Sequence, residues 1–276
     1  MNQTSYDKYK DICDDFKKII TKLNKELPNL KNTLQTMANE KETLPYTVKC
    51  PVVYNESLDA VTKDTEIKLI LIGDNPGKKE QETSRYLIGQ SGKIAEGFFK
   101  KQPDLGIDFR QNVIILNKTP VHTPRTADLK KLIMQTGKLT QEVRSGQTLA
   151  DKNIFDCINQ SEKEMARLLK EIWTVLKVPV WITGYSEMKR KGLFETYTNE
   201  LCSIFKAERD FCASDTDKSQ LFENNVFVFR HFSMNQFTID LNQKKLAGET
   251  VAQCLRRIGT AYRERIFNYF AVEEKL

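Results

Sequence analysis

The chain has 276 residues, of which 39% are hydrophobic and 29% charged, and its formal net charge is +6. This length is typical of one or two domains with a sizeable core, which excludes a disordered chain or a miniprotein. No apolar run approaches the ~18 residues of a membrane helix and the mean hydropathy is −0.51, so we expect no membrane partner.

The N-terminal region, residues 1–45, has the pattern of helices. Its apolar residues recur at helical spacing from Ile12 to Leu23, and Pro28 breaks the pattern. We therefore expect an N-terminal helical extension, residues 1–47, packed on the sheet of a domain that covers residues 48–276. The extension is charged throughout and lacks the apolar segment of a secretory signal, which predicts a cytoplasmic protein.

Four short apolar runs rich in β-branched and aromatic residues are predicted strands buried on both faces: Ile67–Ile72, Val113–Leu116, Val178–Ile182 and Val226–Phe229. Helical patterns lie between and after them, at Ser91–Lys101, Phe155–Leu176 and Thr250–Phe270. Alternating strands and helices predict a three-layer α/β sandwich with a central four-stranded parallel sheet flanked by helices. We expect residues 125–153, rich in Lys, Thr, Gln and Gly, to form a long irregular excursion.

Polar residues follow these strands at the points where parallel sheets bind ligands. The first strand leads into Gly73-Asp74-Asn75-Pro76-Gly77, the second into Asn117, and the fourth into His231. Each is weak evidence alone, because Asn-Pro-Gly is a common turn and a histidine at a strand end is often structural. Their occurrence at corresponding strand ends predicts a binding crevice at the carboxyl edge of the sheet.

The stretch 73–92, GDNPGKKEQETSRYLIGQSG, resembles the first motif of the uracil-DNA glycosylase superfamily. In the iron–sulfur-containing thermophile-type branch this motif reads G-E-A-P-G-x-x-E-D-x-x-G-x-P-F-V-G-x-A-G, and six residues share its register: Gly73, Pro76, Gly77, Glu80, Gly89 and Gly92. The central Asn-Pro-Gly is similar to the G-I-N-P-G of the mismatch-specific branch. Asn117 is similar to the base-reading asparagine, and residues 231–234 resemble the H-P-S-P-like second motif; the resemblance extends from Val52 to Phe237.

The resemblance implies a DNA repair glycosylase that hydrolyses the N-glycosidic bond of uracil or a related damaged base. Its expected catalytic residues are Asp74, Asn75 and His231, with Asn75 orienting the water and His231 stabilising charge on the departing base. The expected substrate-binding residues are Gly73, Gly77, Tyr86, Leu87 and Asn117. Asn117 can match the paired donor and acceptor of a pyrimidine edge, and Leu87 takes the place of the family's stacking aromatic residue.

DNA, single- or double-stranded, is the expected partner, and we expect the protein to act as a monomer. The expected contacts are Lys118, Arg125, Lys189, Arg190, Ser233 and Asn235. The six cysteines include no C-x-x-C pair, so we expect no iron–sulfur centre, no other cofactor and no metal. The alternative function is a non-catalytic relative that binds nucleic acid or a nucleotide through the same crevice.

Overall fold

The computed structural model describes residues 1–41, 46–142, 149–212 and 220–272. Its centre is a parallel sheet of four strands, which are β1 (Leu69–Gly73), β2 (Val113–Asn117), β3 (Val180–Thr183) and β4 (Val226–Phe229). Every residue of these strands is buried. The four apolar runs of the sequence therefore form a sheet covered on both faces, as predicted.

The strand order is β2-β1-β3-β4, so the chain changes direction across the sheet after β2. The first connection places β2 on one side of β1, whereas β3 and β4 follow on the other side. A reversal of this kind leaves a crevice at the carboxyl ends of the two strands between which it occurs, here β1 and β3. The topology thus locates a binding position next to Gly73 and Thr183.

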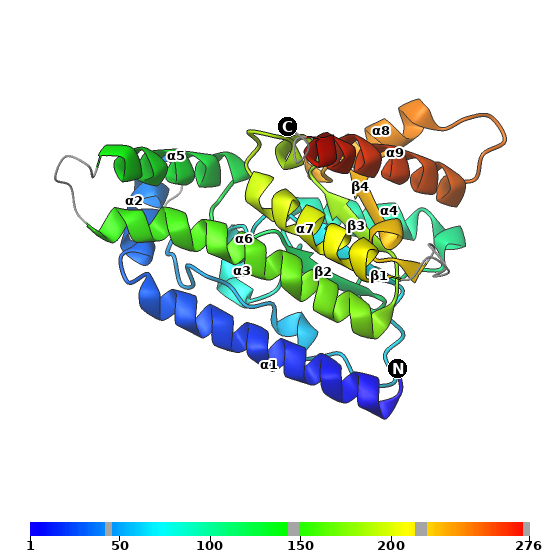
Figure 1. Cartoon of the computed structure of the whole chain (residues 1–276), viewed down its shortest axis with the longest axis horizontal. Helices are drawn as coiled ribbons and strands as arrows, with labels where there is room; N and C mark the ends of the chain where they lie inside the picture. Colours follow the sequence, from blue (N-terminus) through cyan, green and yellow to red (C-terminus); the bar gives the residue numbers. More distant parts are fainter. Residues whose placement is uncertain (42–45, 143–148, 213–219, 273–276) are drawn as a thin grey trace.

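Helices cover both faces of the sheet and make it the middle of three layers (Figure 1). One face carries α6 (Leu149–Leu176) and α7 (Glu195–Phe211), which pack on each other. The other carries α4 (Gln90–Lys100), α8 (Gln236–Lys244) and α9 (Val251–Val272). Trp181 of β3 contacts this second layer, because its ring stacks on Phe99 of α4 and on Phe237 of α8. The three-layer α/β sandwich is the fold predicted from the sequence.

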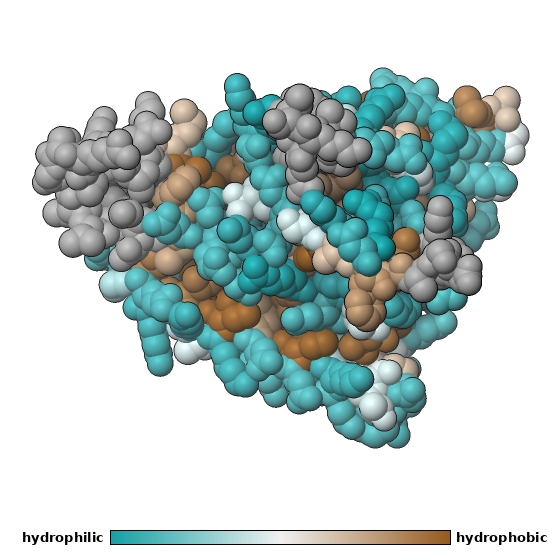
Figure 2. Space-filling view, viewed as in Figure 1, coloured by the Kyte–Doolittle hydropathy of each residue, from teal (hydrophilic) through white to brown (hydrophobic). Residues whose placement is uncertain are grey.

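The N-terminal helices are α1 (Gln3–Glu26) and α2 (Leu30–Lys41), separated near Pro28 as expected. Helix α1 packs on α6 and on the segment before β1, where the Tyr9 hydroxyl donates to the Leu58 carbonyl at 3.1 Å. Figure 2 shows a mainly hydrophilic face with apolar side chains in the seam between α1 and α6. Among the described helices, none is long and apolar enough to cross a membrane.

The expected irregular excursion over residues 125–153 is wrong for most of that range. Helix α5 spans Thr126–Glu142 and α6 already begins at Leu149, while residues 143–148 lie outside the described residues. Leu129 and Leu132 of α5 are fully buried, and α5 packs on α6. Tertiary contact along α6 therefore stabilises a helix that its Thr- and Gly-containing sequence did not predict.

Candidate functional site

A crevice of about 450 Å³ opens at the carboxyl edge of the sheet, where the strand order reverses. We call it the carboxyl-edge crevice, and its walls come from the loops after β1, β3 and β4 and from the start of α5. The lining residues are Asp74, Thr126, Ala127, Lys130, Gly184, Tyr185, Ser186, Glu187, Leu193, Arg230, His231, Ser233 and Gln236. Asp74, His231 and Ser233 were predicted from the sequence, whereas Thr126, Lys130, Gly184 and Arg230 were not.

Asp74 forms a buried ion pair with Lys118. The ammonium group of Lys118 has no exposed surface, lies 2.6 Å from Asp74 Oδ1, and also donates to the carbonyls of Thr183 at 2.6 Å and Gly73 at 3.3 Å. Burial alone would raise the pKa of Asp74, but Lys118, His231 and a hydrogen bond from Thr126 hold it below its usual range. The crevice therefore contains a carboxylate that stays ionised although it is almost completely buried.

Lys118 corrects one sequence-based expectation. We expected its side chain to contact DNA, but three oxygen atoms already accept hydrogen bonds from its ammonium group, and its charge faces the Phe194 ring at 4.7 Å. A fully buried ammonium cannot contact a phosphate on the surface. Lys118 is instead a positioning residue that holds Asp74 in place.

Gly184 makes room for this ion pair. A Cβ at this position would lie 2.5 Å from Asp74 Oδ1 and 3.1 Å from Lys118 Nζ, and the backbone φ is +88°. Both the close approach and the left-handed conformation favour glycine. The Thr-Gly pair after a predicted strand was the available sequence signal, but only the fold shows what the missing side chain permits.

His231 presents one ring nitrogen as an available donor. The backbone N–H of Ser233 donates to Nδ1 at 3.0 Å, so the proton of the neutral ring lies on Nε2. Burial lowers the pKa of His231, with Lys118 acting in the same direction and Asp74 against it, and the ring is therefore mainly neutral at pH 7. Within the described part of the chain, no residue accepts a hydrogen bond from Nε2.

Asn75 lies beside the crevice but its carboxamide is already engaged. Its Nδ2 donates to Thr123 Oγ1 at 2.8 Å, and its Oδ1 lies 3.5 Å from Thr126 Oγ1, whose single hydrogen is shared with Asp74 Oδ2 at 3.3 Å. The buried His122 ring holds the adjacent turn, because its Nδ1 lies 2.9 Å from the Pro76 carbonyl, which can only accept. Sequence reasoning did not single out this histidine.

Glu80, Gly89 and Gly92, which carry much of the motif resemblance, have structural roles here. Glu80 accepts the Gly77 N–H at 2.7 Å and further backbone N–H groups of residues 87–89, so one carboxylate joins both ends of the motif. A Cβ on Gly92 would lie 1.6 Å from the Leu87 carbonyl oxygen. These residues therefore explain how the loop is held and do not themselves indicate a reaction.

None of the five expected substrate-binding residues lines the carboxyl-edge crevice, which leaves out Gly73 and Gly77 as well as the three larger side chains. Leu87 is buried, and so is Tyr86, whose hydroxyl donates to the Val53 carbonyl. Asn117 is 2% exposed, and its Oδ1 would lie 2.4 Å from a Cβ on Gly73. Its Nδ2 has no acceptor among the described residues, which is unfavourable for a buried donor.

Several cationic side chains stand around the crevice, although Glu187 also lines it and Arg230 pairs with Asp240 at 3.4 Å. Lys130 and Arg230 line the crevice, and Lys189, at the end of the loop after β3, lies over the Tyr185 ring at 4.6 Å. Arg125 pairs with Asp128 through two short hydrogen bonds, and Arg190 follows Lys189 directly. The loop after β4 adds an exposed segment, in which Met234 is 83% exposed and Asn235 has a φ of +57°.

Comparison with known proteins gives no family for this chain. No model of a known protein family matches it, and no curated protein matches it either. Within the part of the chain that the structure describes, no three His, Cys, Asp or Glu side chains are grouped so that they could hold a metal ion. The function must therefore be inferred from the carboxyl-edge crevice itself.

Proposed function

We propose that the protein is a DNA glycosylase that hydrolyses the N-glycosidic bond of uracil or a related damaged base. The observation that carries this proposal is the joint presence, in one crevice, of an ionised Asp74 carboxylate and a neutral His231 with an unused Nε2 donor. Glycosidic cleavage places positive charge on the sugar and negative charge on the departing base. In the crevice, the Asp74 carboxylate can stabilise the positive charge on the sugar, and the His231 Nε2–H can stabilise the negative charge on the base.

In the proposed reaction, a flipped nucleotide enters the carboxyl-edge crevice. His231 donates its Nε2 hydrogen to a carbonyl oxygen of the base as negative charge develops there. The Asp74 carboxylate stabilises the oxocarbenium-like sugar and orients the attacking water. Among the described residues, its second oxygen accepts a hydrogen bond from the Thr126 hydroxyl alone, at 3.3 Å. Asn75 then acts by positioning Thr126 and the turn, since its own carboxamide is occupied.

The cationic side chains around the crevice and the loop after β4 support DNA as the substrate. Lys130, Lys189 and Arg230 can contact phosphates on either side of an extruded nucleotide. The exposed Met234 stands on the loop that carries His231, where an apolar side chain can pack against neighbouring bases. Base flipping is required because a base stacked in a duplex cannot reach a crevice of this kind.

One observation favours the non-catalytic alternative, in which the crevice binds a nucleic acid or a nucleotide without cleaving it. The carboxamide of Asn75 is held by two threonines, and the predicted base-reading and stacking residues, Asn117 and Leu87, are buried. Because these residues do not face the crevice, the site has fewer direct contacts to a base. Its cationic side chains can still bind the phosphate of a nucleotide.

The test is base release from single- and double-stranded oligonucleotides that contain uracil, hypoxanthine or xanthine, followed by cleavage at the abasic site. We expect the wild type to release the base. His231→Ala should lower the rate of release by ~10²–10³, which is the effect of losing one donor to the transition state, and Asp74→Asn should lower it by a comparable factor. Asn242→Ala, an exposed position on α8, is the matched control and should leave the rate unchanged. Absence of release of all three bases by the wild type would contradict the enzyme, and retained DNA binding would then favour the alternative.

A further inference from the structure

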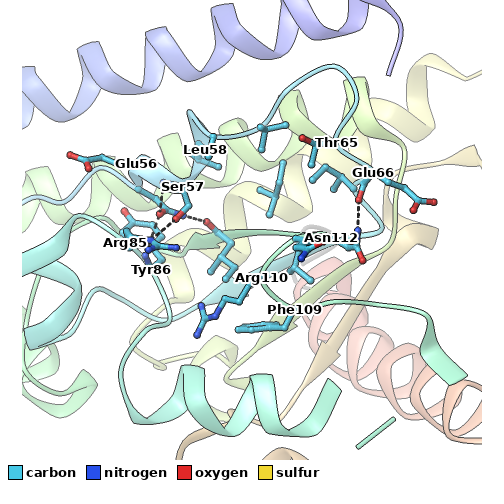
Figure 3. Close-up of a pocket in the computed structure, with 18 of the residues that line it drawn as sticks. Glu56, Ser57, Leu58, Thr65, Glu66, Arg85, Tyr86, Phe109, Arg110 and Asn112 are labelled. Atoms are coloured by element: carbon cyan, nitrogen blue, oxygen red, sulfur yellow. Dashed lines mark hydrogen bonds between the residues drawn. The ribbon is translucent and has the colours of Figure 1, made fainter. Parts of the chain in front are cut away.

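A second cavity, of about 840 Å³, lies along the free edge of strand β2 and is separate from the carboxyl-edge crevice. We call it the edge groove. Its floor is the strand from Val113 to Ile115, and its wall is the segment of residues 55–67, which arches away from β2 (Figure 3). Hydrogen bonds close both ends of the arch, from Asn55 Nδ2 to the Ile115 carbonyl at 2.8 Å and from Asn112 Nδ2 to the Glu66 carbonyl at 2.8 Å.

The backbone of β2 presents an unused acceptor and unused donors to this groove. Asn112 O accepts from Leu69 N–H and Lys118 N–H donates to Gly73 O, so the even-numbered residues of β2 pair with β1. Backbone groups alternate along a strand, and those of Val113 and Ile115 therefore face outward. The Asn55 bond occupies the Ile115 carbonyl, whereas the Val113 N–H and carbonyl and the Ile115 N–H have no partner in the described chain.

We infer that the edge groove binds a nucleotide, whose base pairs with the Val113 carbonyl and the Ile115 N–H and whose phosphate meets Arg85 and Arg110. The Val113 carbonyl accepts and the Ile115 N–H donates, and both lie on the same edge of the strand. A planar ring that carries a donor next to an acceptor can bond to both at once. A volume of 840 Å³ lies within the ~300–1,000 Å³ of small-molecule sites, in which a few backbone groups commonly fix the orientation. The arch closes both ends of the groove, so a compact ligand fits better than an extended peptide.

The side chains around these backbone groups suit the same ligand. Tyr86 and Phe109 stand behind the groove as buried rings, and Arg85 and Arg110 lie on the same side of it (Figure 3). Arg110 is held in position by Glu96 at 3.0 Å and by the Leu87 carbonyl at 3.0 Å. Guanidinium groups bind phosphate through charge-assisted hydrogen bonds, but Arg110 is already paired with Glu96, and Glu56, Asp64 and Glu66 also line the groove. Arg85, whose Nε donates to Ser57 Oγ at 3.3 Å, is therefore the side chain from which we expect the main phosphate contact.

The test is a calorimetric titration of the full chain with AMP, adenosine and acetyl-valine-methylamide as probes. AMP should bind with a Kd below about 1 mM. Arg85→Gln should weaken AMP about tenfold, the loss of one charge-assisted contact, and leave adenosine unchanged. Ala60→Trp, which adds a large side chain on the segment that forms the wall of the groove, should abolish binding of both.

A control variant makes the outcome decisive. Leu246→Trp adds the same side chain at an exposed position outside the groove and should bind AMP like the wild type. AMP binding that Ala60→Trp leaves intact, or no binding of AMP at all, overturns the inference. Binding of acetyl-valine-methylamide as tightly as AMP also overturns it, since the groove would then recognise a peptide edge.

Discussion

The Asp74–Lys118 pair is the residue-level feature on which the carboxyl-edge crevice depends most. A carboxylate and an ammonium group are both removed from water, and each is stable there only because the other is present. The sequence showed Asp74 after one strand and Lys118 after the next. A lysine ammonium group is normally exposed to water, so the sequence favoured a DNA contact on the surface for Lys118. The structure contradicts this expectation, because the side chain is buried.

Lys118→Met should destabilise the protein by about 3–5 kcal/mol, because it leaves the Asp74 charge buried without a partner. Urea unfolding measures this change. Lys100→Met is the matched control, since Lys100 is 74% exposed and pairs with Glu96 on the surface, and should change the free energy of unfolding by less than about 1 kcal/mol. The double variant Lys118→Met/Asp74→Asn should recover part of the loss, and equal effects of the two lysine substitutions would contradict the role of the buried pair.

His122 should make the stability of the protein depend on pH. Burial lowers the pKa of His122 to about 4, against 6.5 for an exposed histidine. The unfolded chain therefore binds a proton before the folded chain does, and the stability that is present above pH 6.5 is lost as the pH falls toward 4. The full loss is about 3 kcal/mol, since one pKa unit corresponds to ~1.36 kcal/mol.

The measurement is the free energy of unfolding of the wild type and of His122→Gln at pH 7 and pH 5. Glutamine does not titrate in this range, so the variant should lose about 2 kcal/mol less than the wild type between the two pH values. Comparing the two proteins cancels the titration of the other groups. A difference between them that stays constant from pH 7 to pH 5 would show that His122 is not buried in its neutral form.

At the scale of elements, two glycines in helices show how packing decides the effect of one substitution. Gly97 lies within α4, where a Cβ would have no atom within 4 Å, whereas a Cβ on Gly259 of α9 would lie 2.7 Å from atoms of Phe227 and Phe229. Helix α9 therefore approaches β4 closely because residue 259 has no side chain. The sequence pattern predicted α9 as a helix but could not reveal this contact.

Gly97→Ala should stabilise the protein by about 0.5–1 kcal/mol, the helix-propensity difference between alanine and glycine. Gly259→Ala makes the same chemical change but should destabilise it by about 1–3 kcal/mol, because overpacking outweighs propensity. Thermal unfolding of the two variants beside the wild type measures both shifts. A stabilising effect of Gly259→Ala would mean that α9 and β4 leave room for a methyl group between them.

At the scale of the whole molecule, the net charge of +6 matters less than where its cations lie. Lys130, Lys189 and Arg230 gather near the carboxyl-edge crevice, while Lys100 lies at the end of α4, which leads back toward the start of β2. If the crevice binds DNA, the cations on its rim should make phosphate contacts and remote ones should not.

Affinity for duplex DNA should fall as salt rises, with a slope of ~0.9 in the logarithmic plot for each phosphate contact. Lys130→Gln and Lys189→Gln should each lower this slope by about one contact, and Lys100→Gln should leave it unchanged. Fluorescence anisotropy across a salt series gives the slopes. Binding that is insensitive to salt, or equally affected by all three substitutions, would count against a DNA partner at this edge.

Local sequence patterns were sufficient to predict the four strands, the helices α4, α6 and α9 and the parallel three-layer architecture, because unbroken apolar runs and helical periodicity are local signals. They also placed Asp74 and His231 at strand ends that meet in one crevice. The folded structure was needed to show that Lys118 is buried, that Gly184 makes room for its ion pair, that Asn75 is held by threonines, and that α5 is a helix. These outcomes depend on residues far apart in the chain, whose contacts set burial, hydrogen-bond partners and charge, and no local pattern records them.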